Sequence, residues 1–157
     1  QLIEVWDKIM LVGKNYNIKP IGLAARDTLR LEMGFCLYGN ELSDDITPIE
    51  AGLTWITKFS KEFNGYNILK EQKENGIKKK LIGFELIEKG IPRKDYEIYD
   101  ENQVKIGRVT SGTMSPSLGK AIGLGFVDNS YAKTNATIYI NIRNNLIKAL
   151  IIKTPFK

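Results

Sequence analysis

The residue types that could carry catalytic chemistry are few in this chain of 157 residues. It contains no histidine, and Cys36 is its single cysteine. Histidine is the commonest general base, so the serine–histidine and cysteine–histidine pairs that activate nucleophiles are excluded. Cys36 alone can form neither an internal disulfide nor a metal site built from several thiolates. Proton transfer by this chain would therefore need a carboxylate, a lysine or a tyrosine, and the cysteine content fits a reducing compartment.

A phosphate-binding loop is also excluded, although segment 112–120 ends in the suggestive pair Gly119-Lys120. Six residues separate Gly112 from Gly119, whereas the phosphate loop has four between its glycines. Ala121 also stands where that loop requires serine or threonine. We expect the hydroxyl groups around this segment to bond local backbone groups of a strand and its turn.

The bulk composition predicts a folded protein with a mixed-charge surface. Hydrophobic residues make up 43% of the chain, which is enough to bury a core. The longest apolar runs, 21–25 and 149–152, are far shorter than the roughly 20 residues that a membrane helix needs, so no membrane span is predicted. The formal net charge of +5 suits an anionic partner, but acidic and basic residues are interleaved in most segments. The basic run 78–80 is either a solvated face or a contact for an acidic partner.

Helical patterns dominate the first half of the chain. Apolar residues recur at helical spacing over 2–14, and strong helix formers fill 22–33 before Gly34, which suits a left-handed helix cap. A loop is predicted over 38–48, which is rich in Gly, Asn, Asp and Ser. The remaining predictions are a helix start at 47–50, a strand at 54–59 and a helix at 66–75 capped by Gly76.

Strand patterns separated by turn signals dominate the second half. Segment 137–143 alternates almost perfectly between apolar and polar residues, and Asn144-Asn145 after it is a two-residue hairpin signal. Several short strands in one half of the chain form a small sheet whose unpaired edges must be hidden. A small antiparallel barrel or sandwich hides them. The predicted class is therefore α+β, with a boundary near 76–80. The six predicted strands are 81–87, 96–99, 104–110, 121–127, 136–142 and 146–153.

Six short stretches carry a resemblance to a known family. They are, in chain order, KPIGLAARDTLRLEMG at 19–34, LYGN at 37–40, TPIEAGL at 47–53, GIPR at 90–93, VTSGTMSPSLG at 109–119 and TPF at 154–156. Together they resemble the signatures of the aminomethyltransferase, or T-protein, family of the glycine cleavage system. The stretches occur in the family's order with similar spacing, and the resemblance covers essentially the whole chain.

The resemblance implies a particular fold. Residues 1–76 would be the end of the family's folate-binding core, with helices and a strand, and residues 77–157 its C-terminal barrel of six antiparallel strands. The family folds as three domains around a central folate channel. An aspartate in the N-terminal half of the family acts on the folate nitrogen, and no residue here matches its motif. We therefore expect this chain to be a C-terminal piece with no catalytic residue of its own, inactive when alone.

The resemblance also implies a reaction. An aminomethyl group carried on the lipoyl arm of the H protein would be released as ammonia while its carbon passes to tetrahydrofolate. The expected partners are therefore tetrahydrofolate and lipoylated H protein, with no metal, no nucleic acid and no membrane. The expected compartment is the bacterial cytoplasm or, in a eukaryote, the mitochondrial matrix.

Three residues are candidates for folate binding. Arg26 matches a family arginine that lines the folate and substrate channel, and a guanidinium offers a rigid fork of donors to a carboxylate or carbonyl. Arg93 matches an arginine near the mouth of that channel. Trp55 follows a turn and could stack on a pterin ring. Arg30, one helical turn after Arg26, is expected to give structural support.

Each candidate has a simpler structural explanation. Arg26 could be an ordinary helix arginine that pairs with Asp27 or Glu32. Arg93 could be a solvated turn residue, and Trp55 could pack in the core.

Two other functions stay open at this point. A non-catalytic folate-binding relative of the same superfamily would share the pocket and lack the transfer chemistry. A small nucleic-acid-binding barrel would suit the basic balance of the chain. Against the second, the strands lack paired aromatic residues with basic residues between them, which single-strand binding favours.

Overall fold

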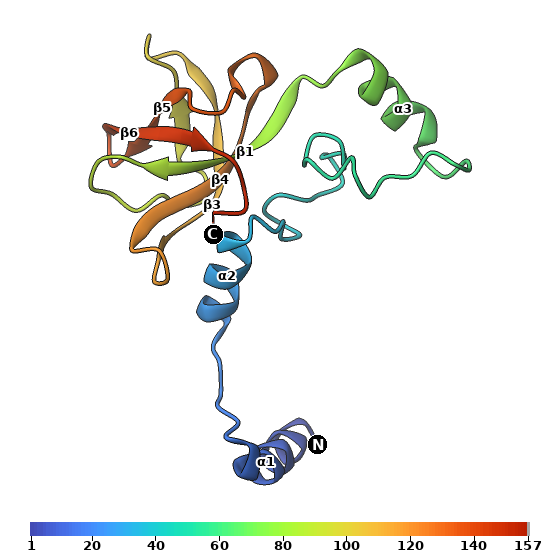
Figure 1. The fold of residues 1–157 in the computed structure, drawn as a ribbon, viewed down its shortest axis with the longest axis vertical. Coiled ribbons are helices and arrows are strands. Elements are labelled where there is room, and N and C mark those ends of the chain that lie inside the picture. Colours follow the sequence, from blue (N-terminus) through green and yellow to red (C-terminus); the bar gives the residue numbers. More distant parts are fainter. Residues whose placement is uncertain (157) are drawn as a thin grey trace.

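The computed structural model describes residues 1–156 and consists of a helical first half and a closed β-barrel (Figure 1). The helices are α1 (Leu2–Gly13), the 3₁₀ helix η1 (Lys14–Tyr16), α2 (Leu23–Glu32) and α3 (Tyr66–Asn75). The strands are β1 (Lys79–Leu86), β2 (Glu97–Tyr99), β3 (Lys105–Ser115), β4 (Lys120–Asp128), β5 (Thr137–Ile142) and β6 (Asn145–Ile152), with the 3₁₀ helix η2 (Asn129–Tyr131) between β4 and β5.

The barrel closes because β1 pairs with a strand on each side. Around the barrel the order is β1-β4-β3-β2-β5-β6, and every pairing is antiparallel. Phe84 of β1 lies opposite Gly123 of β4 on one side and opposite Ile151 of β6 on the other. Closure removes the unpaired edges that an open sheet would expose. The predicted α+β class and its six-stranded antiparallel barrel are confirmed.

The barrel interior is filled by the apolar face of the strands. Phe84, Ile98 and Ile140 are completely buried there. Burying side chains of this size contributes about 1.5 to 3 kcal/mol each. Gly125 of β4 leaves room for this core, because a Cβ at that position would lie 2.8 Å from the Cδ1 of Ile98. The other buried members of the cluster are Ile82, Leu86, Ile106, Val109, Ala121, Val127, Ile138, Ala149 and Ile151.

A register shift in β3 determines which of its hydroxyl groups face outward. Val109 lies in the barrel core, and the pairing of β3 with β4 shifts between Val109 and Ser111. Residues two apart on a strand normally share a face, and a bulge reverses that relation. Ser111 consequently lies opposite Leu124 on the outer face, and Ser115 follows on the same side, opposite Lys120.

Helix α2 packs on this outer face of the barrel, beside β3 and β4 (Figure 1). Leu31 of α2 is completely buried and forms a small second core with Ile122 and Leu124 of β4. Phe156 packs against the same cluster, and its backbone N–H donates to the carbonyl of Glu32 at 2.9 Å. The C-terminal end of α2 is therefore held by both the barrel and the end of the chain.

Helix α1 lies away from the barrel, beyond the extended segment that precedes α2 (Figure 1). None of its residues is buried. Its apolar side chains are exposed to solvent, with Leu2 and Leu11 at 84% and 74%. The predicted helix at 2–14 is confirmed, but within residues 1–156 only the segment directly after it, with Tyr16 and Ile18, lies against its apolar face.

The helix and strand predictions agree with the structure in most places. The three predicted helices and the six predicted strands are all present. Most differ by one or two residues at their ends, but β3 continues to Ser115, five residues past the predicted end at 110. Gly34 and Gly76 follow α2 and α3 with φ of +68° and +92°, as expected of glycine at helix ends.

The strand predicted at 54–59 is wrong. The backbone instead forms successive turns, in which the N–H groups of Ile56 and Thr57 donate to the carbonyls of Leu53 and Thr54. No strand of the described structure pairs with this segment. Turns therefore supply these two backbone hydrogen bonds, where a strand would have needed a neighbouring strand.

Two further local predictions need correction. The helix start at 47–50 is a single turn, because Gly52 adopts φ +74° directly after it. The hairpin turn between β5 and β6 is Arg143-Asn144, one residue before the predicted pair, since Ile142 pairs with Asn145. Both turn residues have positive φ, at 51° and 66°, which two-residue hairpin turns of this kind require.

Candidate functional site

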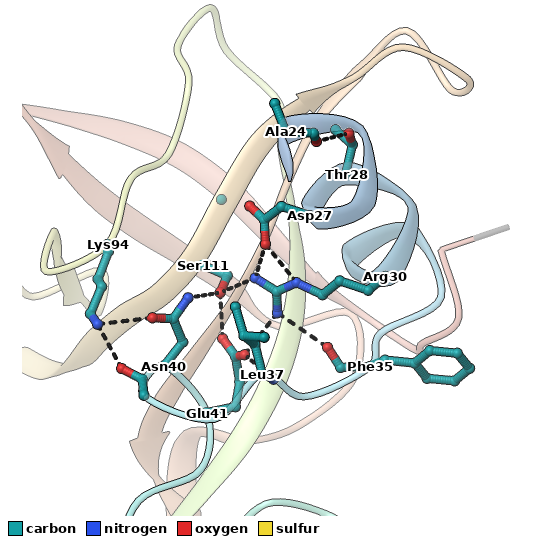
Figure 2. A network of polar contacts seen from close by, with 12 residues as sticks. Ala24, Asp27, Thr28, Arg30, Phe35, Leu37, Asn40, Glu41, Lys94 and Ser111 are labelled. Atoms are coloured by element: carbon teal, nitrogen blue, oxygen red, sulfur yellow. Dashed lines mark hydrogen bonds and ion pairs between the residues drawn. The ribbon is translucent and has the colours of Figure 1, made fainter. Parts of the chain in front are cut away.

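The side chain of Arg30 is the centre of a polar network between α2 and the barrel (Figure 2). Its Nε donates to Asp27 at 2.8 Å, and its Nη1 donates to Glu41 at 2.8 Å and to the carbonyl of Phe35 at 3.1 Å. Its Nη2 donates to the hydroxyl of Ser111 on β3 at 2.7 Å. The guanidinium thus joins α2, the loop after it and the barrel in one contact set.

Glu41 is the buried anion of this network. Its side chain has no solvent exposure, and that of Arg30 is only 9% exposed. One carboxylate oxygen accepts from Arg30 and from the backbone N–H of Leu37 at 2.9 Å, and the other accepts from the Ser111 hydroxyl at 2.6 Å. A buried ion pair costs desolvation energy that only full hydrogen bonding offsets. The pair here has that bonding, so it fixes geometry more than it adds stability.

A second buried carboxylate joins α2 to the same strand. The hydroxyl of Ser115 donates to Glu32 at 2.5 Å, and both side chains are buried. The same hydroxyl accepts from the N–H of Leu118 at 3.0 Å. Ser111 and Ser115 lie on one face of β3, so the helix end is attached to the barrel at two points.

The network continues to the turn before β2. The side-chain amide of Asn40 donates to the Ser111 hydroxyl at 3.1 Å. The ammonium group of Lys94 donates to the carbonyl of Gly39 at 2.7 Å and to the Asn40 side chain at 2.9 Å. Figure 2 shows Lys94 reaching this loop from the side opposite Arg30.

Arg26 lies one helical turn before Arg30 and behaves differently. Its side chain is exposed and makes no hydrogen bond or ion pair with any of residues 1–156. The acids proposed as its alternative partners are engaged elsewhere, Asp27 with Arg30 and Glu32 with Ser115. Arg26 is therefore a free guanidinium on a helix that the network holds in place.

Arg93 and Trp55 are also exposed. The Nη1 of Arg93 donates to the carbonyl of Gly112 at 3.3 Å, and Arg93 borders a cavity at one end of the barrel. Trp55 is 73% exposed in the turns before α3, so its expected packing in a core is not observed in this chain. No hydrogen bond or ion pair of the described structure connects Arg26, Arg93 and Trp55.

The other members of the Arg30 network carry no signal in the local sequence pattern. They include Glu41, Asn40 and Lys94, of which Asn40 ends the LYGN stretch. The hydroxyl of Ser111 was assigned to local backbone groups, and this is wrong, because it bonds side chains that are 70 or more residues away in the sequence. No local pattern pointed to this role, because Ser111 and Ser115 lie beyond the strand predicted at 104–110. The structural role expected for Arg30 agrees with its contacts.

Cys36 lies beside this network. Its thiol is half-buried and donates to the carbonyl of Ala51 at 3.8 Å. Burial raises the pKa of the Cys36 thiol, and the negative charge of Glu41 raises it further, while Arg30 acts in the opposite direction. The thiol is therefore protonated at neutral pH and a poor nucleophile.

The described residues contain no obvious metal or membrane element. No group of three or more Cys, Asp or Glu side chains among residues 1–156 is arranged to hold a metal ion. No helix in this part of the chain has the length and apolar character that crossing a bilayer requires.

The fold and the network define a helical segment fastened to the outside of a closed six-stranded barrel. Residues 79–157 match the family described as glycine cleavage T-protein C-terminal barrel domain, and residues 1–61 match the GCVT N-terminal domain. The chain therefore belongs to the glycine cleavage T-protein family.

Named relatives support this membership over nearly the whole chain. An aminomethyltransferase of Flavobacterium psychrophilum is 57% identical over 97% of this chain and 42% of its own length. An aminomethyltransferase of Thermoanaerobacter pseudethanolicus is 54% identical over 98% of the chain and 42% of its own length. The crystal structure of glycine cleavage system aminomethyltransferase T from Bartonella henselae superposes with a TM-score of 0.88, at 29% identity, over 98% of this chain and 43% of that one. The chain spans less than half the length of these relatives.

The buried pair gives a stability prediction. Replacing Glu41 with Ala leaves the Arg30 guanidinium beside Ser111 without its buried anion, so we expect the free energy of unfolding to fall by about 3 to 5 kcal/mol. Asp27→Ala removes the other ion pair of Arg30. The Asp27 side chain is 47% exposed, so this change should lower the free energy of unfolding by only about 0.2 to 1 kcal/mol. Urea unfolding at neutral pH measures both. Equal losses in the two variants would contradict the account.

The Cys36 environment gives a pH prediction. Because the pKa of the Cys36 thiol is raised by burial and by Glu41, its reaction with iodoacetamide should accelerate at a higher pH in the folded chain than in urea. Mass spectrometry of the alkylated fraction against pH measures both midpoints. A folded midpoint at or below the unfolded one would show that the thiolate is not disfavoured at this position.

Proposed function

We propose that this chain is the C-terminal part of a tetrahydrofolate-dependent aminomethyltransferase of the glycine cleavage system. The complete enzyme would take the aminomethyl group from the lipoyl arm of the H protein, release ammonia and pass the carbon to tetrahydrofolate. The observation that carries the proposal is the guanidinium of Arg26, which has no partner among residues 1–156 and is carried by a fixed helix within a stretch that matches the family.

Arg26 is the residue of this chain that would contact the folate or its aminomethyl donor. Its exposed fork of donors can bind a carboxylate or a polarised carbonyl in two-point fashion. Because Arg30 is tied to Glu41 and Ser111, the helix that carries Arg26 has a defined position on the barrel. A ligand then meets an arginine whose backbone is already positioned, which lowers part of the entropy cost of binding.

Trp55 and Arg93 would complete the contribution of this chain. An indole that is 73% exposed is available to stack on the pterin ring once the ligand is in place. Arg93 would stand near the mouth of the folate channel, with no metal required by any of these contacts. We also propose that residues 1–76 end the folate-binding core and that residues 77–157 form the separate barrel domain.

The catalytic aspartate of the family would come from the part of the relatives that this chain does not span. The chain covers 42% of the Flavobacterium psychrophilum aminomethyltransferase. We therefore expect residues 1–157 alone to release no ammonia from aminomethylated H protein in the presence of tetrahydrofolate.

Replacing Arg26 with Ala in the complete polypeptide tests the proposal. Loss of a charge-assisted hydrogen bond costs about 1.5 to 3 kcal/mol, so kcat/KM for folate-dependent ammonia release should fall roughly 10- to 100-fold. The fold should be unchanged, since Arg26 has no partner among residues 1–156. Ammonia release with aminomethylated H protein, together with the melting temperature, measures both.

Arg108→Ala is the matched control, because Arg108 is an exposed arginine whose ion pair with Asp95 lies on the barrel surface. It should leave kcat/KM unchanged. Unaltered kinetics in Arg26→Ala would show that Arg26 is not a ligand contact. Folate binding by the complete polypeptide without any ammonia release would instead favour a non-catalytic folate-binding relative.

A further inference from the structure

One end of the barrel holds a cavity of about 770 Å³, which lies in the size range of small-molecule sites. Its walls come from the end of β1, the loop 87–93, the turn between β3 and β4 and the turn between β5 and β6. All of these segments belong to the barrel. The cavity is therefore complete within residues 79–156, and it is lined by none of the residues of the Arg30 network.

The floor of the cavity is apolar. Leu86 and Ala121 are buried at its base, and Ile142 and Ile147 pack from there against the barrel core. Ile91, 39% exposed, lies at its side. A floor of this kind binds the hydrocarbon or aromatic body of a ligand, since burial of apolar surface provides most of the affinity in such pockets.

The rim of the cavity is cationic. Four basic side chains line it against the single carboxylate of Glu88, which leaves a formal charge of +3. The basic residues are Lys89, Arg93, Lys120 and Arg143.

Three of these four cations have no carboxylate partner in the described structure. Lys120 is paired with Glu85 at 3.0 Å. The side chains of Lys89 and Arg143 make no hydrogen bond or ion pair with residues 1–156, and that of Arg93 bonds only the carbonyl of Gly112. Unpaired cations brought together from separate turns repel one another, and an anion relieves that repulsion.

We propose that this barrel-mouth cavity binds an amphipathic carboxylate, a small molecule with an aromatic or aliphatic body and at least two carboxylate groups. The apolar floor takes the body, and Lys89, Arg93 and Arg143 take the carboxylates. A guanidinium binds a carboxylate through two parallel hydrogen bonds, so the two arginines discriminate a carboxylate from a neutral amide.

Two sources of such a ligand share this chemistry. One is the benzoyl-glutamate tail of the folate acceptor in the function proposed above, and the other is a free dicarboxylate that acts independently of folate. The two differ in one respect, because a bound folate would occupy the cavity only in the first case. The inference itself does not require the transferase function, since the cavity lies wholly within this chain.

Chemical-shift mapping on the isotope-labelled 157-residue chain tests the proposal, with N-benzoyl-glutamate as the probe and its neutral diamide as the matched control. The probe should shift backbone signals of residues around the cavity and should bind at least tenfold more tightly than the diamide. Raising the salt from about 0.05 to 0.5 M should weaken binding several-fold, because exposed charges are screened.

Two variants locate the charge. Lys89→Gln and Arg143→Asn each remove a cation whose side chain has no other partner in the described chain, and asparagine tolerates the positive φ at position 143. Each should weaken probe binding about tenfold, since a charge-assisted hydrogen bond is lost. Lys133→Gln removes an exposed cation outside the cavity and should have no effect. Arg26→Ala should likewise bind the probe normally, which separates this inference from the proposed function.

The proposal is overturned if the probe does not bind at about 10 mM, if the diamide binds equally well, or if the shifts fall on α1 instead of the barrel mouth. Tetrahydrofolate added to the complete polypeptide distinguishes the sources. Displacement of the probe from the cavity identifies the folate tail, and retention of the probe identifies a separate carboxylate.

Discussion

The ion pair of Arg30 and Glu41 controls how the two parts of this chain fit together. Both side chains are largely removed from water, and the pair is anchored to β3 through the hydroxyl of Ser111. Burying two charges is unfavourable unless every lone pair and proton is satisfied. The contact set meets that demand with groups from α2, from the loop after it and from the barrel. Moving any of these elements would leave a buried charge without its hydrogen bonds, and this cost holds α2 and its loop in place on the barrel.

This constraint gives two arginines of one helix different environments. The guanidinium of Arg30 is largely buried and fully hydrogen-bonded. Arg26 lies one turn earlier on the same helix, and its guanidinium is exposed. Side chains that bind ligands perform best when their backbone is positioned by packing and hydrogen bonds. The barrel contributes to this positioning, because Ser111 and Ser115 both bond carboxylates from the helical half. The cavity at one end of the barrel is lined by other cations, namely Lys89, Arg93, Lys120 and Arg143.

The local elements of the fold could be predicted from the sequence because their signals are local. Apolar spacing, helix-ending glycines and alternating strands located the helices and all six barrel strands. The strand predicted at 54–59 failed because β structure needs a partner, and the pattern of one segment does not contain that information. The network around Arg30 could not be predicted for a related reason. Ser111 lies 81 residues from Arg30 in the sequence, and a bulge decides which way its hydroxyl faces.

The candidate site depended on family resemblance to a greater degree. Composition and spacing gave no reason to prefer Arg26 over Arg30, since both are arginines in one helical stretch. The structure adds that Arg26 has no side-chain partner in the described part of the chain and that Trp55 is exposed. The roles of Arg26, Arg93 and Trp55 stay predictions, as does the domain boundary near 76–80.

A double-mutant cycle on Arg30 and Glu41 tests the central claim most directly. The unfolding free energies of Arg30→Met, Glu41→Leu and the combined variant are compared with that of the unaltered chain. Each single change strands a buried charge, and the combined change removes both, so the combined loss should be smaller than the sum of the single losses by more than about 1 kcal/mol. Losses that add within about 0.5 kcal/mol would show that the two side chains are not coupled, and the ion pair would not be what holds α2 on the barrel.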